Sequence, residues 1–134
     1  MAYLLDTNIA VHAREGAAPV LAKLARHEGS VMMSALSLAE LQRGLYKRPE
    51  LTSVRMARMA SLLDAVPVLA FDAAAAHAYG QIIRRCGWAK GRDFDRMIAA
   101  HAISADATLV TNNTADFRDI PGLRLEDWVE GSPT

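Results

Sequence analysis

Hydrophobic residues gather in a few short runs, separated by longer segments with helical spacing. The runs at Tyr3–Leu5, Val31–Met33, residues 66–71 and Thr108–Val110 are bounded by polar residues, glycine or proline, which predicts four short strands. A weaker run at Leu123–Leu125 predicts a further short strand near the end of the chain. Strands of this length suit a small sheet buried between helices.

The segments between these runs place apolar residues three, four and seven positions apart, which is the spacing of one helical face. The clearest example holds Leu38, Leu41 and Leu45, and Ser37 and Glu40 in this segment have the spacing of a capping box. The predicted helices are Ile9–Arg14, Ala17–Glu28, the segment around residues 37–45, Leu51–Asp64, a helix from the cap Asp72 to about Arg85, and Asp95–Ala105.

Strands that alternate with helices indicate parallel pairing through right-handed crossovers, so the predicted fold class is an α/β sandwich with a short central parallel sheet. In such sheets ligands bind beyond the carboxyl ends of the strands. Asp6 directly follows the first strand, and Asn112, Asn113 and Asp116 follow the fourth. These residues are therefore predicted to lie on the functional edge of the sheet.

Length and composition limit the number of domains and the kinds of site that this chain can form. A chain of 134 residues, 51% of them apolar, predicts a single domain over residues 1–130, followed by a short tail at residues 131–134. One cysteine excludes an internal disulfide and a four-cysteine metal site, which fits a reducing cytoplasm. No signal peptide or membrane span is expected. The net charge of zero argues against nucleic-acid binding by bulk charge, but leaves room for local phosphate contacts.

Each acid near a helix start has a structural explanation of its own. Asp6 is placed to cap the first helix, Glu40 to close a capping box, and Asp95 to favour a helix dipole from the first turn. If these carboxylates converge, their mutual repulsion requires a cation. A cluster of hard oxygen ligands suits Mg²⁺, with Mn²⁺ as a substitute, and does not suit zinc.

The segment "RDFDRMIAAHA" at residues 92–102 contains two acids only two positions apart. At 100° per helical residue, Asp93 and Asp95 point about 200° apart, so both cannot face one metal. Asp95 shares a face with apolar residues of the same helix, whereas Asp93 is interpreted as its N-cap. His101 lies on a different face from Asp95 and is interpreted as a surface or hydrogen-bonded histidine without a metal.

Basic residues surround Trp88 in the segment before this helix. They are Arg84, Arg85, Lys90, Arg92 and Arg96. Two interpretations stay open: a solvated loop with an anchoring tryptophan, or a phosphate-binding lip on which Trp88 stacks against an unpaired base. A second basic group flanks the helix of Glu40. It consists of Arg43, Lys47, Arg48, Arg55 and Arg58. The stripe Met56–Met59 is interpreted as core; only the family resemblance carried by the sequence blocks below adds a partner-binding surface as an alternative.

Four blocks of this sequence resemble the signature blocks of PIN-domain ribonucleases, and more narrowly the VapC-type toxins of toxin–antitoxin pairs. The blocks are "LLDTNIAVH" at 4–12, "SALSLAELQRGL" at 34–45, "FDRMIAAHA" at 94–102 and "TLVTNNTADFRDIPGLRLEDW" at 108–128. They occur in the order found in the family and span nearly the whole chain. The resemblance implies a PIN-like α/β/α fold.

The resemblance also implies the site. Asp6, Glu40 and Asp95 match the family's three acids, as catalytic residues and metal ligands. For the fourth acid, Asp116 is preferred as an outer contributor, with Asn113 as a neutral substitute. Thr7 and Thr111 are expected to support the site through hydrogen bonds. Phe94 departs from the commoner form, in which asparagine occupies this position.

The function implied is a Mg²⁺-dependent endoribonuclease toxin that hydrolyses RNA, with tRNA favoured as substrate, and that pairs with a cognate antitoxin protein and forms a homodimer. The alternative is a PIN-like module that binds RNA or a partner without cutting. That alternative predicts a missing core acid, whereas Asp6, Glu40 and Asp95 are all present. A phosphoacceptor signalling domain does not fit, because Thr7 and Asn8, not a second acid, follow Asp6.

Overall fold

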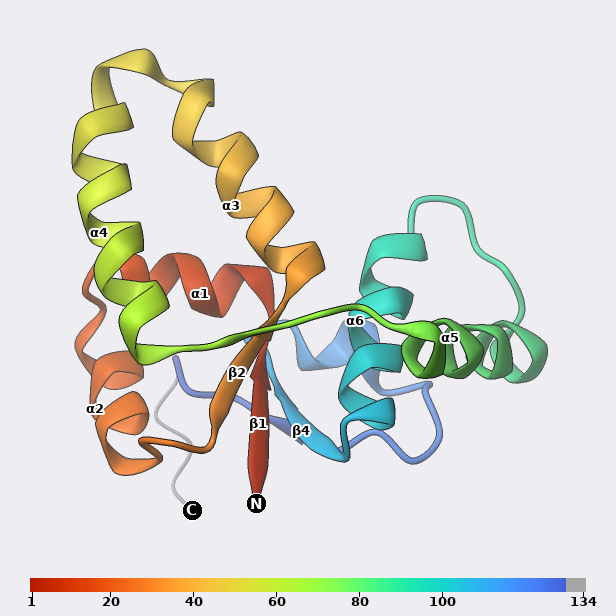
Figure 1. Ribbon diagram of the computed structural model, residues 1–134. Helices are drawn as coiled ribbons and strands as arrows, with labels where there is room; N and C mark the ends of the chain where they lie inside the picture. The colour runs from red at the N-terminus through yellow and green to blue at the C-terminus, as the bar shows by residue number, and fades with distance from the viewer. Residues whose placement is uncertain (130–134) are drawn as a thin grey trace.

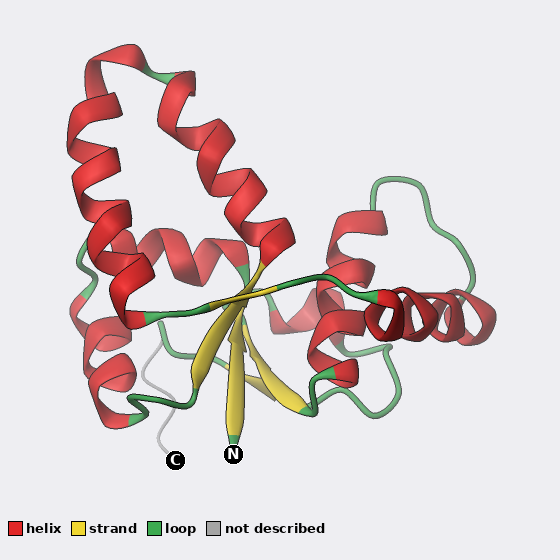
Figure 2. Ribbon diagram, viewed as in Figure 1, coloured by secondary structure: helices red, strands yellow, loops and turns green. Residues whose placement is uncertain are grey.

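The computed structural model describes residues 1–129 and is built around a five-stranded sheet in which every pairing is parallel (Figures 1 and 2). The strand order is β3-β2-β1-β4-β5. The strands are β1 (Ala2–Leu5), β2 (Val31–Ser34), β3 (Val68–Leu69), β4 (Ala107–Val110) and β5 (Leu125–Glu126). The predicted fold class is therefore confirmed. The predicted tail at residues 131–134 lies outside the described residues.

Helices cover both faces of the sheet, as Figure 1 shows. On one face lie α1 (Thr7–Arg14), α2 (Ala18–Arg26), α3 (Ala35–Lys47) and α4 (Thr52–Ala65), and on the other lie α5 (Ala73–Cys86) and α6 (Asp93–Ser104). Two short 3-10 helices, η1 (Pro49–Leu51) and η2 (Thr114–Phe117), complete the described elements. Among residues 1–129, no helix is long and apolar enough to cross a membrane.

The central strand supplies both hydrophobic cores, because successive side chains of a strand point to opposite faces. Tyr3 and Leu5 pack in the core beneath α1, α3 and α4, whereas Leu4 packs in the core beneath α5 and α6. Leu4 and Leu5 are both fully buried. A strand buried on both faces explains why "YLL" is continuously apolar and does not alternate with polar residues.

Two helix caps predicted from the sequence are wrong. The helix that carries Glu40 begins at Ala35, and its N-cap is Ser34, whose Oγ accepts a hydrogen bond from the backbone N–H of Leu36 at 3.0 Å. The capping box of Ser37 and Glu40 was therefore wrong, and Glu40 lies in the second turn. The N-cap of α6 is Arg92, without a side-chain bond, so the prediction of Asp93 as N-cap was also wrong.

The direction of the chain across the sheet changes at its centre. From β1 the chain moves outward to β2 and β3, then returns to the other side of β1 to form β4 and β5. Leu5 pairs with Met33 of β2 and with Val110 of β4, so the carboxyl ends of these three strands lie side by side. A crevice beyond the strand ends at such a switch point is where open parallel sheets bind ligands.

Candidate active site

A cavity of about 210 Å³ opens at this switch point and gathers acids from four separate segments of the chain. Its lining residues are Asp6, Thr7, Asn8, Glu40, Phe94, Asp95, Asn113, Asp116 and Phe117. All four acids expected from the sequence are therefore brought together at one cleft. No cysteine or histidine lines the cleft. The atoms it offers to a metal ion are therefore carboxylate and hydroxyl oxygens, together with the side-chain amides of two asparagines.

Asp6 is fixed by its position between β1 and α1. Its backbone N–H donates to the carbonyl of Val110 at 2.9 Å, which extends the pairing of β1 with β4 by one residue. One carboxylate oxygen accepts from the backbone N–H of Thr7 at 2.7 Å, and the other accepts from the hydroxyl of Thr111 at 2.9 Å. Asp6 is therefore both the N-cap of α1 and a rigidly oriented carboxylate of the cleft.

Thr7 and Ser37 connect the first helix to the helix of Glu40. The hydroxyl of Thr7 donates to the Oγ of Ser37 at 2.9 Å, and Ser37 is fully buried. Glu40 follows one helical turn after Ser37 and reaches the cleft from α3. Its carboxylate also lies 3.4 Å from the guanidinium of Arg43, a largely exposed ion pair that restrains it weakly.

The first turn of α6 separates its two acids, as the helical phase predicted. Asp95 lines the cleft, whereas Asp93 does not. Asp93 accepts hydrogen bonds from the hydroxyl of Tyr79 at 2.6 Å and from the indole N–H of Trp88 at 3.0 Å. Asp93 therefore orders the segment between α5 and α6 from the side of the helix that faces away from the cleft.

The turn after β4 contributes both candidates for the fourth acid. Asn113 and Asp116 line the cleft, and both are exposed. The backbone N–H of Asn113 donates to the hydroxyl of Thr111 at 3.0 Å, and that hydroxyl itself donates to Asp6. Thr111 thus links the turn to the buried carboxylate. The role of Asp116 or Asn113 in catalysis stays a prediction.

Burial and mutual repulsion raise the pKa of two carboxyl groups in the cleft. The pKa of Asp6 is raised first by burial and then by Asp95 and Glu40, although the hydrogen bonds from Thr111 and Thr7 act in the opposite direction. The pKa of Asp95 is raised first by burial and then by Asp116 and Glu40, against the lowering effect of Arg92 and Arg96. The carboxylates are thus close enough to destabilise one another.

This donor set fits a hard divalent cation that keeps some of its water. Within residues 1–129, no three His, Cys, Asp or Glu side chains already form a closed metal-binding set. Mg²⁺ retains several waters and takes only one or two carboxylates directly, so widely spaced acids around an open cleft suit it. Zinc, which prefers a closed tetrahedral set of nitrogen and sulfur ligands, does not fit these residues.

The basic residues of the expected lip separate into two groups. Arg84, Arg85, Trp88 and Lys90 are exposed, and Arg92 is half-buried, with its guanidinium donating to the carbonyl of Asp116 at 2.8 Å. Arg96 is a correction: it is only 4% exposed and pairs with Asp119 at 3.0 Å. It follows Asp95 on the helix and turns toward the interior, so it is not an exposed phosphate ligand.

Sequence reasoning missed several residues at the site. Asn8 and Phe117 line the cleft, and Ser37 supports it from below. Asn8 could have been predicted to lie at the cleft, because it follows Asp6 by two residues at the start of a helix. Phe117 is 1% exposed and forms an apolar wall, and its spacing gave no sign of this role.

The other candidates lie away from the cleft. His101 is buried, with Nδ1 2.8 Å from the Oγ of Ser34, so the interpretation as a hydrogen-bonded histidine is confirmed. The methionine stripe divides, because Met59 is buried in the core while Met56 is 50% exposed. In the second basic group, Arg55 donates to the carbonyl of Gly44, and Arg48 pairs with Glu50.

The molecule has a short parallel sheet between helices, with acids gathered beyond the central strands. This arrangement is that of the PIN-domain class. Residues 3–123 match the PIN domain family. Two similar curated proteins cover almost the whole chain. The tRNA(fMet)-specific endonuclease VapC of Shigella flexneri is 37% identical and covers 94% of this chain and 97% of its own length. Ribonuclease VapC2 of Rickettsia felis is 35% identical and covers 96% and 98%.

Solved structures agree with these relatives. The Rickettsia felis VapBC2 structure bound to a promoter DNA fragment superposes with a TM-score of 0.84 at 33% identity, covering 96% of this chain and 99% of that one. The DNA-bound VapBC of Salmonella typhimurium gives a TM-score of 0.84 at 29% identity, covering 96% and 98%. The chain therefore belongs to the PIN-domain family and, within it, to the VapC-type ribonuclease toxins of toxin–antitoxin pairs.

Proposed function

We propose that this protein is a Mg²⁺-dependent endoribonuclease, the toxin of a toxin–antitoxin pair, in which a divalent ion activates water for hydrolysis of RNA phosphodiester bonds. The observation that carries the proposal is the convergence of Asp6, Glu40, Asp95 and Asp116 on one cleft. The raised pKa of Asp6 and of Asp95 supports it, because crowded buried carboxylates are stabilised by a cation. Mn²⁺ is the expected substitute ion.

We assign each acid of the cleft a role from its position. Asp6 and Asp95 would hold the ion directly, since burial and neighbouring carboxylates raise the pKa of these two acids. Glu40 completes the site from α3, and Asp116 acts from the exposed rim. These residues would hold a divalent ion, which would supply a lowered pKa for a bound water and positive charge opposite the scissile phosphate. Thr111 and the N–H of Thr7 keep Asp6 oriented and ionised.

The names of the relatives guide the choice of substrate and partner. One similar protein is named as a tRNA(fMet)-specific endonuclease, and the similar structures are of VapBC pairs. We therefore propose a tRNA as the substrate and a cognate antitoxin protein as the partner of this chain. A homodimer and a cytoplasmic location belong to the same proposal.

The direct test is cleavage of purified tRNA by the purified protein. We expect cleavage with Mg²⁺ or Mn²⁺, none in EDTA, and a loss of at least about 100-fold in Asp95→Asn. Because no ribose hydroxyl serves as nucleophile, the new ends should be 5′-phosphate and 3′-hydroxyl, which end-labelling with and without phosphatase distinguishes.

His77→Asn, an exposed position on α5, is the matched control and should cleave like the wild type. Cleavage that continues in EDTA, or products with 2′,3′-cyclic phosphate ends, would contradict the proposed mechanism. Binding of tRNA without any cleavage at any metal concentration would instead favour the non-catalytic binding module.

A further inference from the structure

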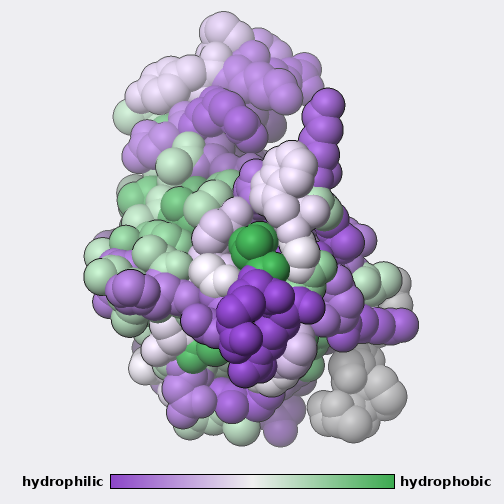
Figure 3. Space-filling model, turned by 90° about the vertical axis from the view of Figure 1, so that its right-hand side faces the viewer, coloured by the Kyte–Doolittle hydropathy of each residue, from purple (hydrophilic) through white to green (hydrophobic). Residues whose placement is uncertain are grey.

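The two tryptophans of the chain have opposite environments. Trp128 is 1% exposed in the core, whereas Trp88 is 63% exposed on the segment between α5 and α6. Figure 3 shows the face of the molecule that carries α5 and this segment, and strongly hydrophilic surface gathers there next to paler and hydrophobic surface. A single exposed ring is ordinary by itself, so the contacts that hold Trp88 carry the argument.

Trp88 is exposed but not free to turn. Its ring N–H lies 3.0 and 3.3 Å from the two carboxylate oxygens of Asp93, so one edge of the ring is held. The same carboxylate accepts from the hydroxyl of Tyr79 on α5, which Asp93 in turn gives a raised pKa. The Asp93 carboxylate therefore ties together α5, α6 and Trp88, while 63% of the tryptophan stays exposed to solvent.

The backbone around Trp88 is also specified. Gly87 and Gly91 flank it with φ values of +79° and +80°, a conformation that other residues adopt only with strain. After the second glycine, the guanidinium of Arg92 donates to the carbonyl of Asp116 at 2.8 Å. The segment is thus attached to Asp93 on one side and to the rim of the acidic cleft on the other.

The surroundings of Trp88 match a nucleic acid. Arg84, Arg85 and Lys90 are exposed in the same stretch of chain. Asp93 and Asp95 share the first turn of α6 but point to opposite sides, so Trp88 and the cleft lie on two sides of one helix start. An RNA strand that reached from the cleft to Trp88 would cross this helix start, close in sequence to basic side chains able to offset its charge.

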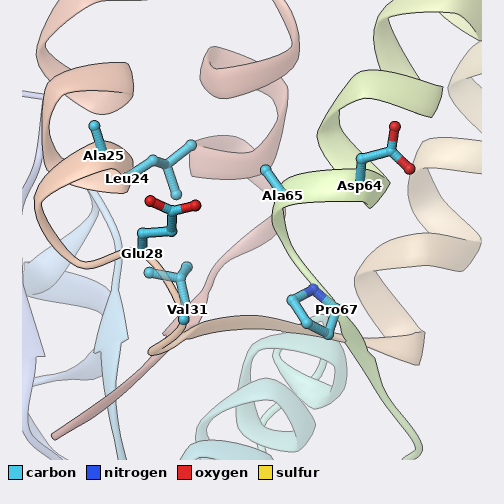
Figure 4. A pocket seen from close by; sticks show the side chains of 8 residues that line it. Leu24, Ala25, Glu28, Val31, Asp64, Ala65 and Pro67 are labelled. Carbon is cyan, nitrogen blue, oxygen red and sulfur yellow. The ribbon is translucent and has the colours of Figure 1, made fainter.

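A larger cavity elsewhere in the molecule lacks these properties. It measures about 510 Å³ and lies between α2, the end of α4 and β2, with Glu28 and Asp64 among its lining residues, as Figure 4 shows. No aromatic ring, arginine or lysine lines it. The features that suit RNA are therefore concentrated at the segment between α5 and α6.

We propose that Trp88, held at its ring edge by Asp93, is a stacking platform for an unpaired base of the RNA substrate. Asp93 is then a positioning residue, which acts through Trp88 and not on the scissile phosphate. The inference rests on the proposed function for the identity of the ligand as RNA. It adds a requirement for an unpaired base that lies across the start of α6 from the cleaved bond, and it assigns a role to Asp93, the acid that does not line the cleft.

The test uses binding without cleavage. A single-stranded RNA oligonucleotide is titrated into the protein in EDTA, and the tryptophan emission is followed. Stacking should quench the emission of Trp88, while the buried Trp128 contributes an unchanged background. Trp88→Ala should weaken binding about ten-fold or more, because base–aromatic stacking is strong and independent of sequence. Trp88→Phe should retain much of the affinity.

Tyr46→Ala is the matched control, because Tyr46 is 64% exposed on α3, away from this segment. Its RNA affinity should equal that of the wild type. Asp93→Asn, which keeps one acceptor oxygen, should raise KM for RNA with little change in kcat, and Asp93→Ala should raise KM further. A structural defect would instead lower the melting temperature of these variants without this split between KM and kcat.

Three outcomes overturn the inference. If Trp88→Ala binds single-stranded RNA as tightly as the wild type, or loses affinity for the antitoxin instead, Trp88 is not a base platform. Failure of the proposed function is visible separately, since the wild type then cleaves no RNA with Mg²⁺. Wild-type cleavage that is abolished in Asp95→Asn but unaffected in Trp88→Ala rejects the inference alone.

Discussion

At the scale of single residues, Asp6 shows that a structural role and a chemical role can share one side chain. As the N-cap of α1 it accepts from Thr7, and as a lining residue of the cleft it is held by Thr111. The sequence offered these roles as alternatives. In the structure the cap is what aims the carboxylate, because both oxygens have a donor from the protein.

Thr111→Val tests this arrangement. The change removes the hydroxyl that donates to Asp6 at 2.9 Å, and the backbone N–H of Asn113 loses its acceptor. We expect the free energy of unfolding at neutral pH to fall by about 1–3 kcal/mol and cleavage to fall about ten-fold. Urea unfolding and RNA cleavage measure the two effects. Thr111→Ser keeps the hydroxyl and should recover both, and an inactive Thr111→Ser would count against this reasoning.

The fourth acid is a second question at this scale. Asp116 and Asn113 both line the cleft, and only Asp116 carries charge. We expect Asp116→Asn to lower the cleavage rate about ten-fold or more, less than Asp95→Asn, because it acts from the exposed rim. Asn113→Ala should have a smaller effect. Initial rates over a range of Mg²⁺ concentrations measure this, and a larger loss in Asn113→Ala would reverse the assignment.

At the scale of elements, the short strands and most helices were predictable because their hydrophobic spacing is clear. The errors fell at helix starts. Ser34 caps α3, although Ser37 and Glu40 have capping-box spacing, since strand β2 passes directly into the helix without a loop. Aspartate is a common N-cap residue, but the carboxylate of Asp93 accepts hydrogen bonds from Tyr79 and Trp88, which lie outside its helix. Single-sequence spacing carries no information about such partners.

His101 is the polar link between elements on the α6 side of the sheet. Its ring contacts Ser34 at the start of α3, the backbone of Ala70 and the ring of Phe71. Replacing it by phenylalanine keeps an aromatic ring but leaves the buried Ser34 hydroxyl without this partner. We expect the free energy of unfolding to fall by about 1–3 kcal/mol in urea unfolding. His77→Phe, at an exposed position of α5, should cost far less.

The same histidine predicts a pH dependence. Burial lowers the pKa of His101 below its ordinary value of 6.5, so the unfolded chain takes up a proton first as the pH falls. Stability contributed by His101 is therefore present above pH 6.5 and is lost as the pH falls toward the lowered value of the folded state. The difference between wild type and His101→Phe should shrink over this range, and a constant difference would contradict the assignment.

At the scale of the whole molecule, the cleft opposes folding unless a cation is bound. The raised pKa of Asp95 means that its favourable contribution is present at low pH and is lost as the pH rises through the folded value. In EDTA at pH 7.5, Asp95→Asn should therefore have a higher melting temperature than the wild type. The gain should disappear as the pH is lowered into the acidic range.

Addition of Mg²⁺ should reverse this order. At a hundred-fold excess over its Kd, the ion should stabilise the wild type by about 2.7 kcal/mol, and Asp95→Asn by much less. Thermal unfolding monitored by circular dichroism measures both proteins. Asp64→Asn, in an acid outside the cleft, is the control and should respond to Mg²⁺ like the wild type. An equal response in Asp95→Asn would mean that Asp95 does not hold the ion.

The arrangement of the whole sheet was only partly predictable. Parallel pairing and an edge for ligands follow from the alternation of strands and helices, and all four expected acids line the cleft. The order of the strands does not follow from spacing, because each is short and apolar enough to occupy the centre. The burial of Arg96 could not be predicted from the sequence either, because its ion-pair partner Asp119 lies in a turn far away along the chain.

The position of β1 has a consequence for protein synthesis. The first strand of the chain is the centre of the sheet, and its neighbour β4 spans Ala107–Val110. A growing chain on the ribosome therefore cannot close the pairing of β1 with β4 until Ala107–Val110 have emerged. Until then it carries Asp6 and Glu40 but neither Asp95 nor Asp116 beside them. Abortive translation products of this gene are thus expected to leave the RNA of their own ribosomes uncut.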